Sequence, residues 1–115
     1  MPEPTSSSAE AKFRDQVLAE LRHAVREAKA AHPEIVKVLL VGSLAQGNWT
    51  AASEANLIVV VSKEFPDFLR SRAPYQIFVR SIPTDSLVYS EHEFVQMSRD
   101  WDSILAQDLP TAIEL

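Results

Sequence analysis

The chain has 115 residues, of which 46% are hydrophobic, and this length fits one domain with a small buried core. Its formal net charge of −5 argues against a protein that mainly grips a nucleic-acid backbone, although backbone N–H groups can still hold a nucleotide. The absence of cysteine excludes disulfides and thiolate metal sites. No apolar run has membrane-spanning length, and the polar first residues lack the apolar stretch of a signal peptide. We therefore expect a soluble, cytoplasmic protein without a membrane partner.

The first predicted element is a long amphipathic helix. Residues 1–8, rich in proline and serine, are expected to form a disordered tail, and residues 9–115 a single domain. Ser7 and Glu10 have the spacing of a capping box, and the helix that starts there should reach about Ala31. Its apolar face should pack on a sheet and its opposite face should be polar. The apolar positions are Phe13, Val17, Leu21, Val25 and Ala28, and the polar ones include Arg14, Glu20, Arg22 and Lys29.

Two strands frame a tight turn in the middle of the chain. Residues 35–41 are rich in leucine and β-branched side chains, and residues 55–61 are apolar on both faces, as in the interior of a sheet. Gly42 breaks the first strand, and Ser43 is expected to cap a short helical turn toward Gln46. A loop follows, up to the second strand.

The next segment predicts a helix and then a third strand. Residues 72–81 should form a short helix that turns Tyr75, Phe78 and Val79 inward, with Pro74 in its first turn. Residues 84–89 should form the third strand.

The last segment begins with another capping box. Ser90 and Glu93 predict a helix start at Glu91, and Tyr89 with Phe94 has the spacing of a hydrophobic staple. A final helix should end at Pro110, and residues 112–115 are expected to add a short strand. The apolar residues of that final helix are Trp101, Ile104 and Leu105. In all, the elements predict an α/β (α+β) fold with a small mixed β-sheet flanked by helices.

Residues suited to phosphate and metal chemistry gather around the central turn. Gly42 lets the backbone turn sharply and approach a phosphate closely. Ser43 offers a hydroxyl and N–H groups at a helix N-terminus, where the dipole attracts anions. Glu54 and Asn56, at positions i and i+2 of a strand, point to the same face. Two acids so placed, with a third from a neighbouring strand, can hold two Mg²⁺ ions about 3.5–4 Å apart.

This pattern resembles a known family signature. Val41-Gly42-Ser43, then ten residues, then Glu54-Ala55-Asn56-Leu57 is similar to the DNA polymerase β-like nucleotidyltransferases, especially their minimal domains. That family has apolar-Gly-Ser, a loop of about this length, and Asp-apolar-Asp-apolar on the next strand. Gly47 and the segment from Pro83-Thr84-Asp85 to Phe94 extend the resemblance. It implies the nucleotidyltransferase fold and two sets of site residues. The nucleotide-binding residues are Gly42, Ser43 and Gly47, and the catalytic positions are Glu54, Asn56 and Asp85.

The sequence departs from the family at the metal positions. Glu54 replaces the first Asp, neutral Asn56 replaces the second, and Asp85 matches the third. The implied metal ligands are therefore only Glu54 and Asp85, and two charges instead of three give weak support for Mg²⁺. Gln46 also stands where many minimal members have arginine. Each of the three residues has a structural alternative: a solvated charge for Glu54, a side chain that bonds a turn for Asn56, and a backbone cap for Asp85.

Three interpretations of function remain open. The resemblance implies an enzyme that transfers a nucleoside monophosphate from a nucleoside triphosphate, by expectation ATP, to an acceptor hydroxyl with Mg²⁺ and weakened activity. The alternative is a catalytically inactive nucleotide-binding or protein-interaction module. Some minimal members act with a helical partner in toxin–antitoxin-like pairs, so the partner expected is a helical protein or a second copy. Because a fold does not set a function, an unrelated role is the third interpretation.

Histidines, an aromatic residue and several arginines lie outside this signature. His23, His32 and His92 have no ligand spacing and are expected at the surface. Trp49 can stack on a base or anchor its own loop. Three arginines near the third strand can reach phosphates or be solvated: Arg70, Arg72 and Arg80.

Overall fold

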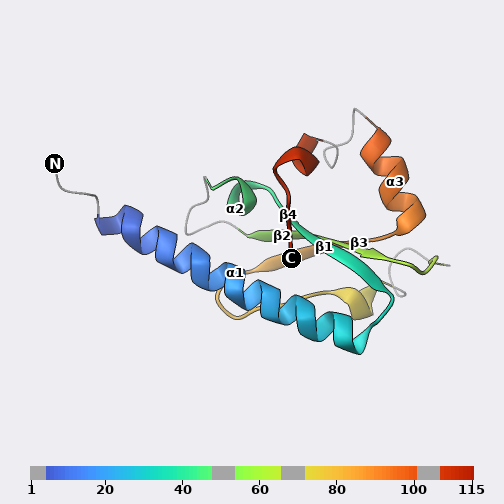
Figure 1. Cartoon of the computed structure of the whole chain (residues 1–115), viewed down its shortest axis with the longest axis horizontal. Coiled ribbons are helices and arrows are strands. Elements are labelled where there is room, and N and C mark those ends of the chain that lie inside the picture. Colours follow the sequence, from blue (N-terminus) through green and yellow to red (C-terminus); the bar gives the residue numbers. More distant parts are fainter. Residues whose placement is uncertain (1–4, 48–53, 66–71, 101–106) are drawn as a thin grey trace.

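The centre of the molecule is a four-stranded mixed sheet, shown in a computed structural model (Figure 1). The strands are β1 (Ile35–Val41), β2 (Ala55–Val61), β3 (Thr84–Ser90) and β4 (Ile113–Glu114). Their order is β3-β2-β1-β4, with β1 antiparallel to β2 and β4, and β2 parallel to β3. The predicted mixed sheet flanked by helices is therefore confirmed. The structure describes residues 5–47, 54–65, 72–100 and 107–115, with side chains from residue 11 onward.

One face of the sheet packs on helix α1 (Thr5–Ala31) (Figure 1). The predicted apolar face is confirmed, since Val17, Leu21 and Val25 are buried against alternate residues of β2. Burying each such side chain contributes about 1.5–3 kcal/mol. The helix begins before Ser7, so the predicted capping start is too late and residues 5–8 are helical instead of part of a tail. Within the described part of the chain, no helix is long and apolar enough to cross a membrane.

The other face carries a second, smaller apolar cluster. Helix α3 (Glu91–Arg99) and the last residues of the chain cover it (Figure 1). Tyr89 and Phe94 both lie against this cluster, as the predicted staple requires, and the Lys37 ammonium sits 4.6 Å from the centre of the Phe94 ring. The buried members are Leu39, Val41, Ile58 and Val60, with Met97, Leu109 and Ala112 packed on them.

The helix predicted over residues 72–81 is wrong. Only η1 (Ala73–Tyr75) is helical, as a 3-10 turn, and the chain then leaves it in an extended conformation beside β3. Buried Tyr75, buried Ile77 and half-buried Val79 alternate along the chain, which is the period of an extended segment. Phe78, predicted to turn inward, is 73% exposed because it lies on the opposite side of that alternation.

Side chains of β3 satisfy the backbone of this segment in place of helical hydrogen bonds. The Ile77 N–H donates to the Ser86 hydroxyl at 3.1 Å, and the Thr84 hydroxyl donates to the Ile77 carbonyl at 2.6 Å. The Gln76 amide donates to the Ser86 carbonyl at 3.0 Å. These bonds also occupy the outer edge of β3, which would otherwise be open to another strand.

The C-terminal prediction is partly corrected. The final strand is confirmed as Ile113–Glu114, but Pro110 lies inside the 3-10 turn η2 (Leu109–Thr111) and does not end a helix. Its ring is tolerated there because the first helical positions need no N–H partner. The residues of the predicted final helix, Trp101, Ile104 and Leu105, lie outside the described residues.

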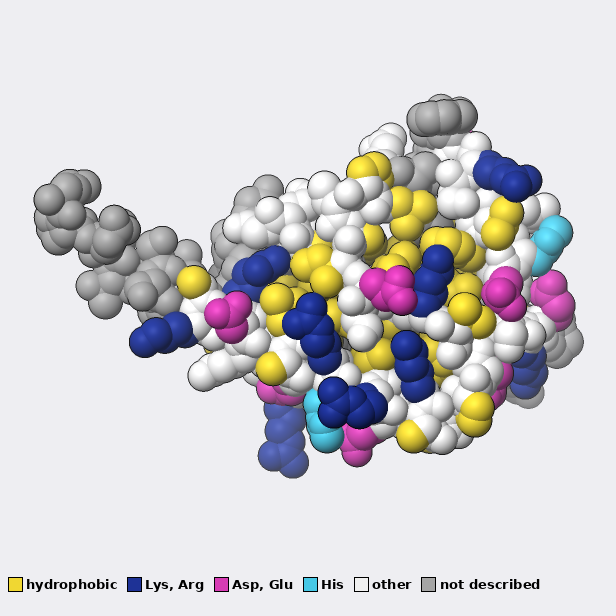
Figure 2. Space-filling model, in the orientation of Figure 1, with side chains coloured by type: hydrophobic (Ala, Val, Ile, Leu, Met, Phe, Trp, Pro, Cys, Tyr) yellow, Lys and Arg dark blue, Asp and Glu magenta, His cyan; other side chains and the backbone are white. Residues whose placement is uncertain are grey.

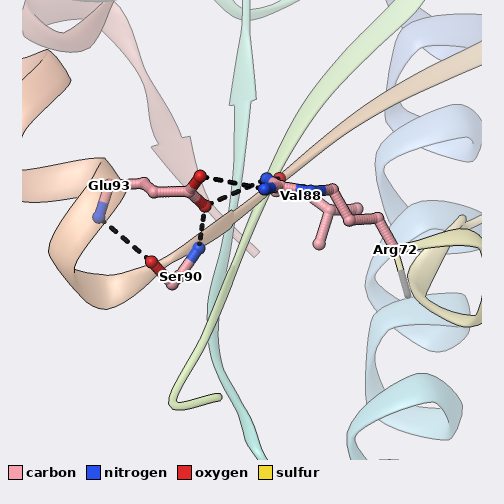
Figure 3. Close-up of polar contacts among 4 residues, drawn as sticks. All are labelled: Arg72, Val88, Ser90 and Glu93. Carbon is pink, nitrogen blue, oxygen red and sulfur yellow. Dashed lines mark hydrogen bonds and ion pairs between the residues drawn. The ribbon is translucent and has the colours of Figure 1, made fainter. Parts of the chain in front are cut away.

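An ion pair joins η1 to the start of α3 across β3 (Figure 3). The Arg72 guanidinium donates two bonds of 2.9 Å to the Glu93 carboxylate and one of 2.7 Å to the Val88 carbonyl. Glu93 also accepts the Ser90 N–H at 2.9 Å, while the Ser90 hydroxyl accepts the Glu93 N–H at 3.1 Å. The predicted capping box is thus confirmed, and it is part of a larger network. Hydrogen bonding to Arg72 lowers the pKa of Glu93 below its ordinary value of 4.5.

Replacing Glu93 with glutamine should lower the free energy of unfolding at pH 7 by about 1–2 kcal/mol. Hydrogen bonds to charged groups contribute about 1.5–3 kcal/mol, and the value is reduced here because 35% of the Glu93 side chain stays exposed. Since the folded-state pKa is lowered, the contribution of Glu93 is full above pH 4.5 and is lost as pH falls through the lowered value. Urea unfolding at a series of pH values measures the gap between native protein and variant, which should close in acid.

The matched control is Glu91→Gln, in the same first turn but exposed. It should change stability by less than about 0.5 kcal/mol. A gap for Glu93→Gln that stays constant down to pH 3 would contradict the assigned ion pair.

Candidate functional site

The strand registers bring the signature residues together at one end of the sheet. In the antiparallel ladder Val41 lies opposite Asn56, and in the parallel ladder Asn56 lies opposite Asp85. These three residues form a row across β1, β2 and β3. The turn that starts at Gly42 leaves β1 at the end of this row. Residues 42 and 85 are distant in sequence, so the ladders are what place them at one site.

The turn itself is built on two glycines in left-handed backbone conformations. Gly42 has φ 84° and ψ −159°, a region that is essentially restricted to glycine. It is the N-cap of helix α2 (Ser43–Gln46), so Ser43 is the first helical residue and not the predicted cap. Gly47, with φ 88° and ψ 3°, ends α2, and its N–H donates to the Ser43 carbonyl at 3.0 Å. At position 42, the turn therefore depends on a backbone geometry that only glycine adopts easily.

Asn56 packs directly against Gly42. A Cβ atom at position 42 would lie 3.0 Å from the Asn56 amide nitrogen, which is closer than ordinary contact distance. Glycine is thus required both by its conformation and by the space that Asn56 fills. The contact gives Asn56 a packing role beside the turn, in addition to its place in the row.

The two acidic residues flank this contact. Glu54 directly precedes β2, and Asp85 lies next to Asn56 on β3; both are exposed. The Ala55 N–H donates to the Pro83 carbonyl at 2.9 Å, which extends the β2–β3 connection up to Glu54. Alternation along the strand directs Glu54, Asn56 and Asp85 to the same face of the sheet. The arrangement offers two carboxylates and one neutral amide.

This donor set fits one Mg²⁺ ion better than two. Mg²⁺ takes six oxygen ligands and is commonly bound by one or two carboxylates together with substrate phosphates and water. Among the residues that the structure describes, no group of three His, Cys, Asp or Glu side chains could hold a metal ion. A two-metal site needs such a group to bridge and balance both ions, and neutral Asn56 does not supply the third acid.

Arg14 of α1 bonds to the backbone of the turn, a contact that the sequence did not predict. Its Nε donates to the Leu44 carbonyl at 3.0 Å and its guanidinium reaches the Ala45 carbonyl at 3.4 Å. These carbonyls belong to α2, where a cation also interacts favourably with the helix dipole. Arg14 was expected on the polar face of the long helix, and nothing local predicts a bond to a residue 30 positions away.

Two of the arginines expected near the third strand, Arg72 and Arg80, have partners away from the row. Arg72 is bound to Glu93 and Val88, and Arg80 is exposed, with its backbone N–H donating to Glu20 at 2.7 Å. Gln46 is exposed at the end of α2. Arg70 and Trp49 lie outside the described residues. The described arginine head group that bonds the turn is that of Arg14, and it donates to carbonyls of α2.

A cavity of about 360 Å³ lies beside β3, away from the turn. Residues 86–89 line it together with Arg72, Ala73 and Gln76, and its walls include neither Gly42 nor Asn56. The cavity and the signature row are separate features of the sheet.

The histidines have no metal-binding arrangement in the described structure. His23 is exposed and bonds Glu27 one helical turn away at 3.1 Å, and His92 is also exposed, as predicted. His32 is only half exposed and packs edge-on against Tyr75 at 5.1 Å between ring centres. Burial, with a hydrogen bond to Glu34, raises the pKa of Tyr75 to about 12. These contacts join η1 to the turn between α1 and β1.

Replacing Gly42 with alanine should cost about 2–3 kcal/mol of stability, because the backbone strain adds to displacement of Asn56. Gly47→Ala is the matched control, since a Cβ there meets nothing within 4 Å and only the left-handed conformation is strained. Its cost should be about 1 kcal/mol. Thermal unfolding of both variants measures the difference, and equal costs would show that neither the Gly42 conformation nor the Asn56 contact adds to the cost of an ordinary left-handed position.

Comparison with known proteins gives one informative result. No protein-family model matches the chain, and no curated protein sequence does. A crystal structure from Sulfolobus solfataricus, described as a candidate nucleotidyltransferase, superimposes with a TM-score of 0.65 at 20% sequence identity. The similarity covers 84% of this chain and 84% of that one.

At this level of identity the likeness bears on the fold alone. The chain has a nucleotidyltransferase-like fold.

Proposed function

We propose that this chain binds a nucleoside triphosphate at the turn of residues 42–47 and that its metal-dependent nucleotidyl transfer is weakened. The observation that carries the proposal is the row in which neutral Asn56, packed on Gly42, lies next to Asp85. The turn that favours phosphate binding is intact, whereas the middle position of the metal site carries no charge.

Support for a phosphate ligand comes from the backbone of the turn. Gly42 has no side chain to block close approach, and the N-terminal end of α2, where the helix dipole is positive, follows it directly. Such ends attract phosphate oxygens, as in other turns that follow a strand. The resemblance suggests ATP as the nucleotide. Among the described residues, no side chain has been assigned to discriminate between bases.

Support for residual metal chemistry comes from Glu54 and Asp85. When bound there with the triphosphate, Mg²⁺ would neutralise charge on the α-phosphate and on the departing pyrophosphate. A single ion would leave the acceptor hydroxyl without the second metal that activates it in an intact site. Transfer would therefore be slow.

A second candidate function is an inactive protein-interaction module, with a helical protein or another copy as partner. It is favoured by large apolar side chains exposed near β3 and α3. These are Phe78 at 73%, Leu87 at 49% and Val95 at 43% exposure. Both functions are compatible in one molecule, because these side chains are not among the signature residues.

The metal dependence of ATP binding tests the main proposal. Calorimetric titration should show that Mg²⁺ changes the affinity of the native protein for ATP by less than about threefold. The variant with Glu54→Asp and Asn56→Asp should bind ATP at least about tenfold more tightly with Mg²⁺ than without, because a restored carboxylate pair coordinates the ion.

The matched control carries Glu91→Asp and Gln96→Glu, which likewise shorten one carboxylate and convert one amide to an acid, at exposed positions of α3. It should behave like the native protein. Strong Mg²⁺ dependence with turnover in the native protein would contradict the weakened site. Absence of ATP binding in all three proteins would contradict phosphate binding at the turn.

A further inference from the structure

One edge of the sheet is formed by β3, and its outward backbone groups have identifiable partners. The Ala55 N–H donates to the Pro83 carbonyl at the start of the parallel ladder, so the odd-numbered residues of β3 bond to β2. Alternation along the strand then directs the N–H and carbonyl groups of Ser86, Val88 and Ser90 outward. The Ser90 N–H is already bonded within the capping box of α3.

Side chains also bond the two outward carbonyls of this edge. The Ser86 carbonyl accepts a hydrogen bond from Gln76 at 3.0 Å, and the Val88 carbonyl accepts one from Arg72 at 2.7 Å. Between these two carbonyls lies the Val88 N–H, for which no described residue provides an acceptor. A backbone donor that is removed from water is costly unless it is paired. This donor is therefore available to a ligand.

The unbonded donor belongs to the wall of the cavity of about 360 Å³. Arg72, Gln76 and Val88 all line this cavity, and Leu87 and Tyr89 supply much of its apolar surface. Cavities of about 150 Å³ with apolar walls hold a benzene molecule, and sites for small molecules begin at about 300 Å³. The space therefore suits a molecule of about two rings.

The surroundings of the cavity carry no net charge. Among its described lining residues only Arg72 is charged, and its guanidinium is paired with Glu93 and lies 4.5 Å from the centre of the Phe65 ring. Burial raises the pKa of Tyr89 above its ordinary value of 10.0, so the hydroxyl stays neutral. Figure 2 shows Lys and Arg side chains over α1, which contributes no residue to the cavity. An anionic ligand would lie near Glu93 without a cation of its own, so an uncharged ligand fits better.

We propose that this cavity binds an uncharged, mainly apolar small molecule that carries a carbonyl oxygen. The oxygen accepts the hydrogen bond of the Val88 N–H, and the rings of the molecule pack against the apolar wall. Because Arg72 and Gln76 are already bonded to β3, these side chains are ordered before the ligand arrives. The walls include no residue of the turn at 42–47, so the inference is independent of the proposed nucleotide binding.

Two bicyclic probes that differ only at the carbonyl test the proposal: α-tetralone, and tetralin, which has the same rings without the oxygen. Titrated into the isotope-labelled full chain, α-tetralone should shift the amide resonances of Leu87 and Val88 until they saturate. Tetralin should bind about tenfold more weakly, because it leaves the Val88 N–H without an acceptor. Ala73→Phe, at an exposed position on the rim, should fill the cavity and weaken α-tetralone binding at least about tenfold.

The matched control is Ala19→Phe, which makes the same change at an exposed position of α1 outside the cavity. It should leave the affinity for α-tetralone within about twofold. The comparison of the two probes on the native protein does not depend on either variant. Equal affinity for both probes would overturn the proposal. So would the absence of a saturable shift at Val88, or α-tetralone binding that Ala73→Phe leaves unchanged.

Discussion

The pairing of β2 with both of its neighbours is the constraint on which the rest of the structure depends. Its antiparallel ladder with β1 places Asn56 beside Val41 and the Gly42 turn, and its parallel ladder with β3 places Asn56 beside Asp85. Because alternate residues of β2 face opposite sides, the same strand also supplies buried residues to both apolar clusters. A shift of one residue in either ladder would move the buried side chains to the opposite face of the sheet and would separate the residues of the site.

The chemical character of the candidate site follows from the residues of that row and of the turn beside it. A glycine with φ 84° at the end of β1 frees the backbone to receive an anion, and Arg14 holds the carbonyl end of the short helix behind it. The neighbouring position holds an amide that packs on the glycine, where a carboxylate would be needed to share two metal ions. In the function that we propose, the site would therefore hold phosphate better than it accelerates phosphoryl transfer.

The sequence predicted the features that depend on local patterns. Runs of apolar residues predicted β1 and β2, and the spacing of Ser90 and Glu93 predicted the start of α3. The error at residues 72–81 arose from assigning a helical period to apolar residues that alternate, since Tyr75, Ile77 and Val79 face inward and Phe78 does not. The roles of Arg14 and Arg72 could not be predicted, because each bonds residues far along the chain that only the folded sheet brings near.

In the proposed function, the row through Asn56 holds a triphosphate with at most one metal ion. A crystal structure with a non-hydrolysable ATP analogue and Mn²⁺, with metal positions located from anomalous scattering, is the sharpest test. We expect phosphate oxygens against the backbone of residues 42–47 and no more than one Mn²⁺, held between the phosphates, Glu54 and Asp85. Two Mn²⁺ ions about 3.5–4 Å apart, bridged by these carboxylates, would contradict it.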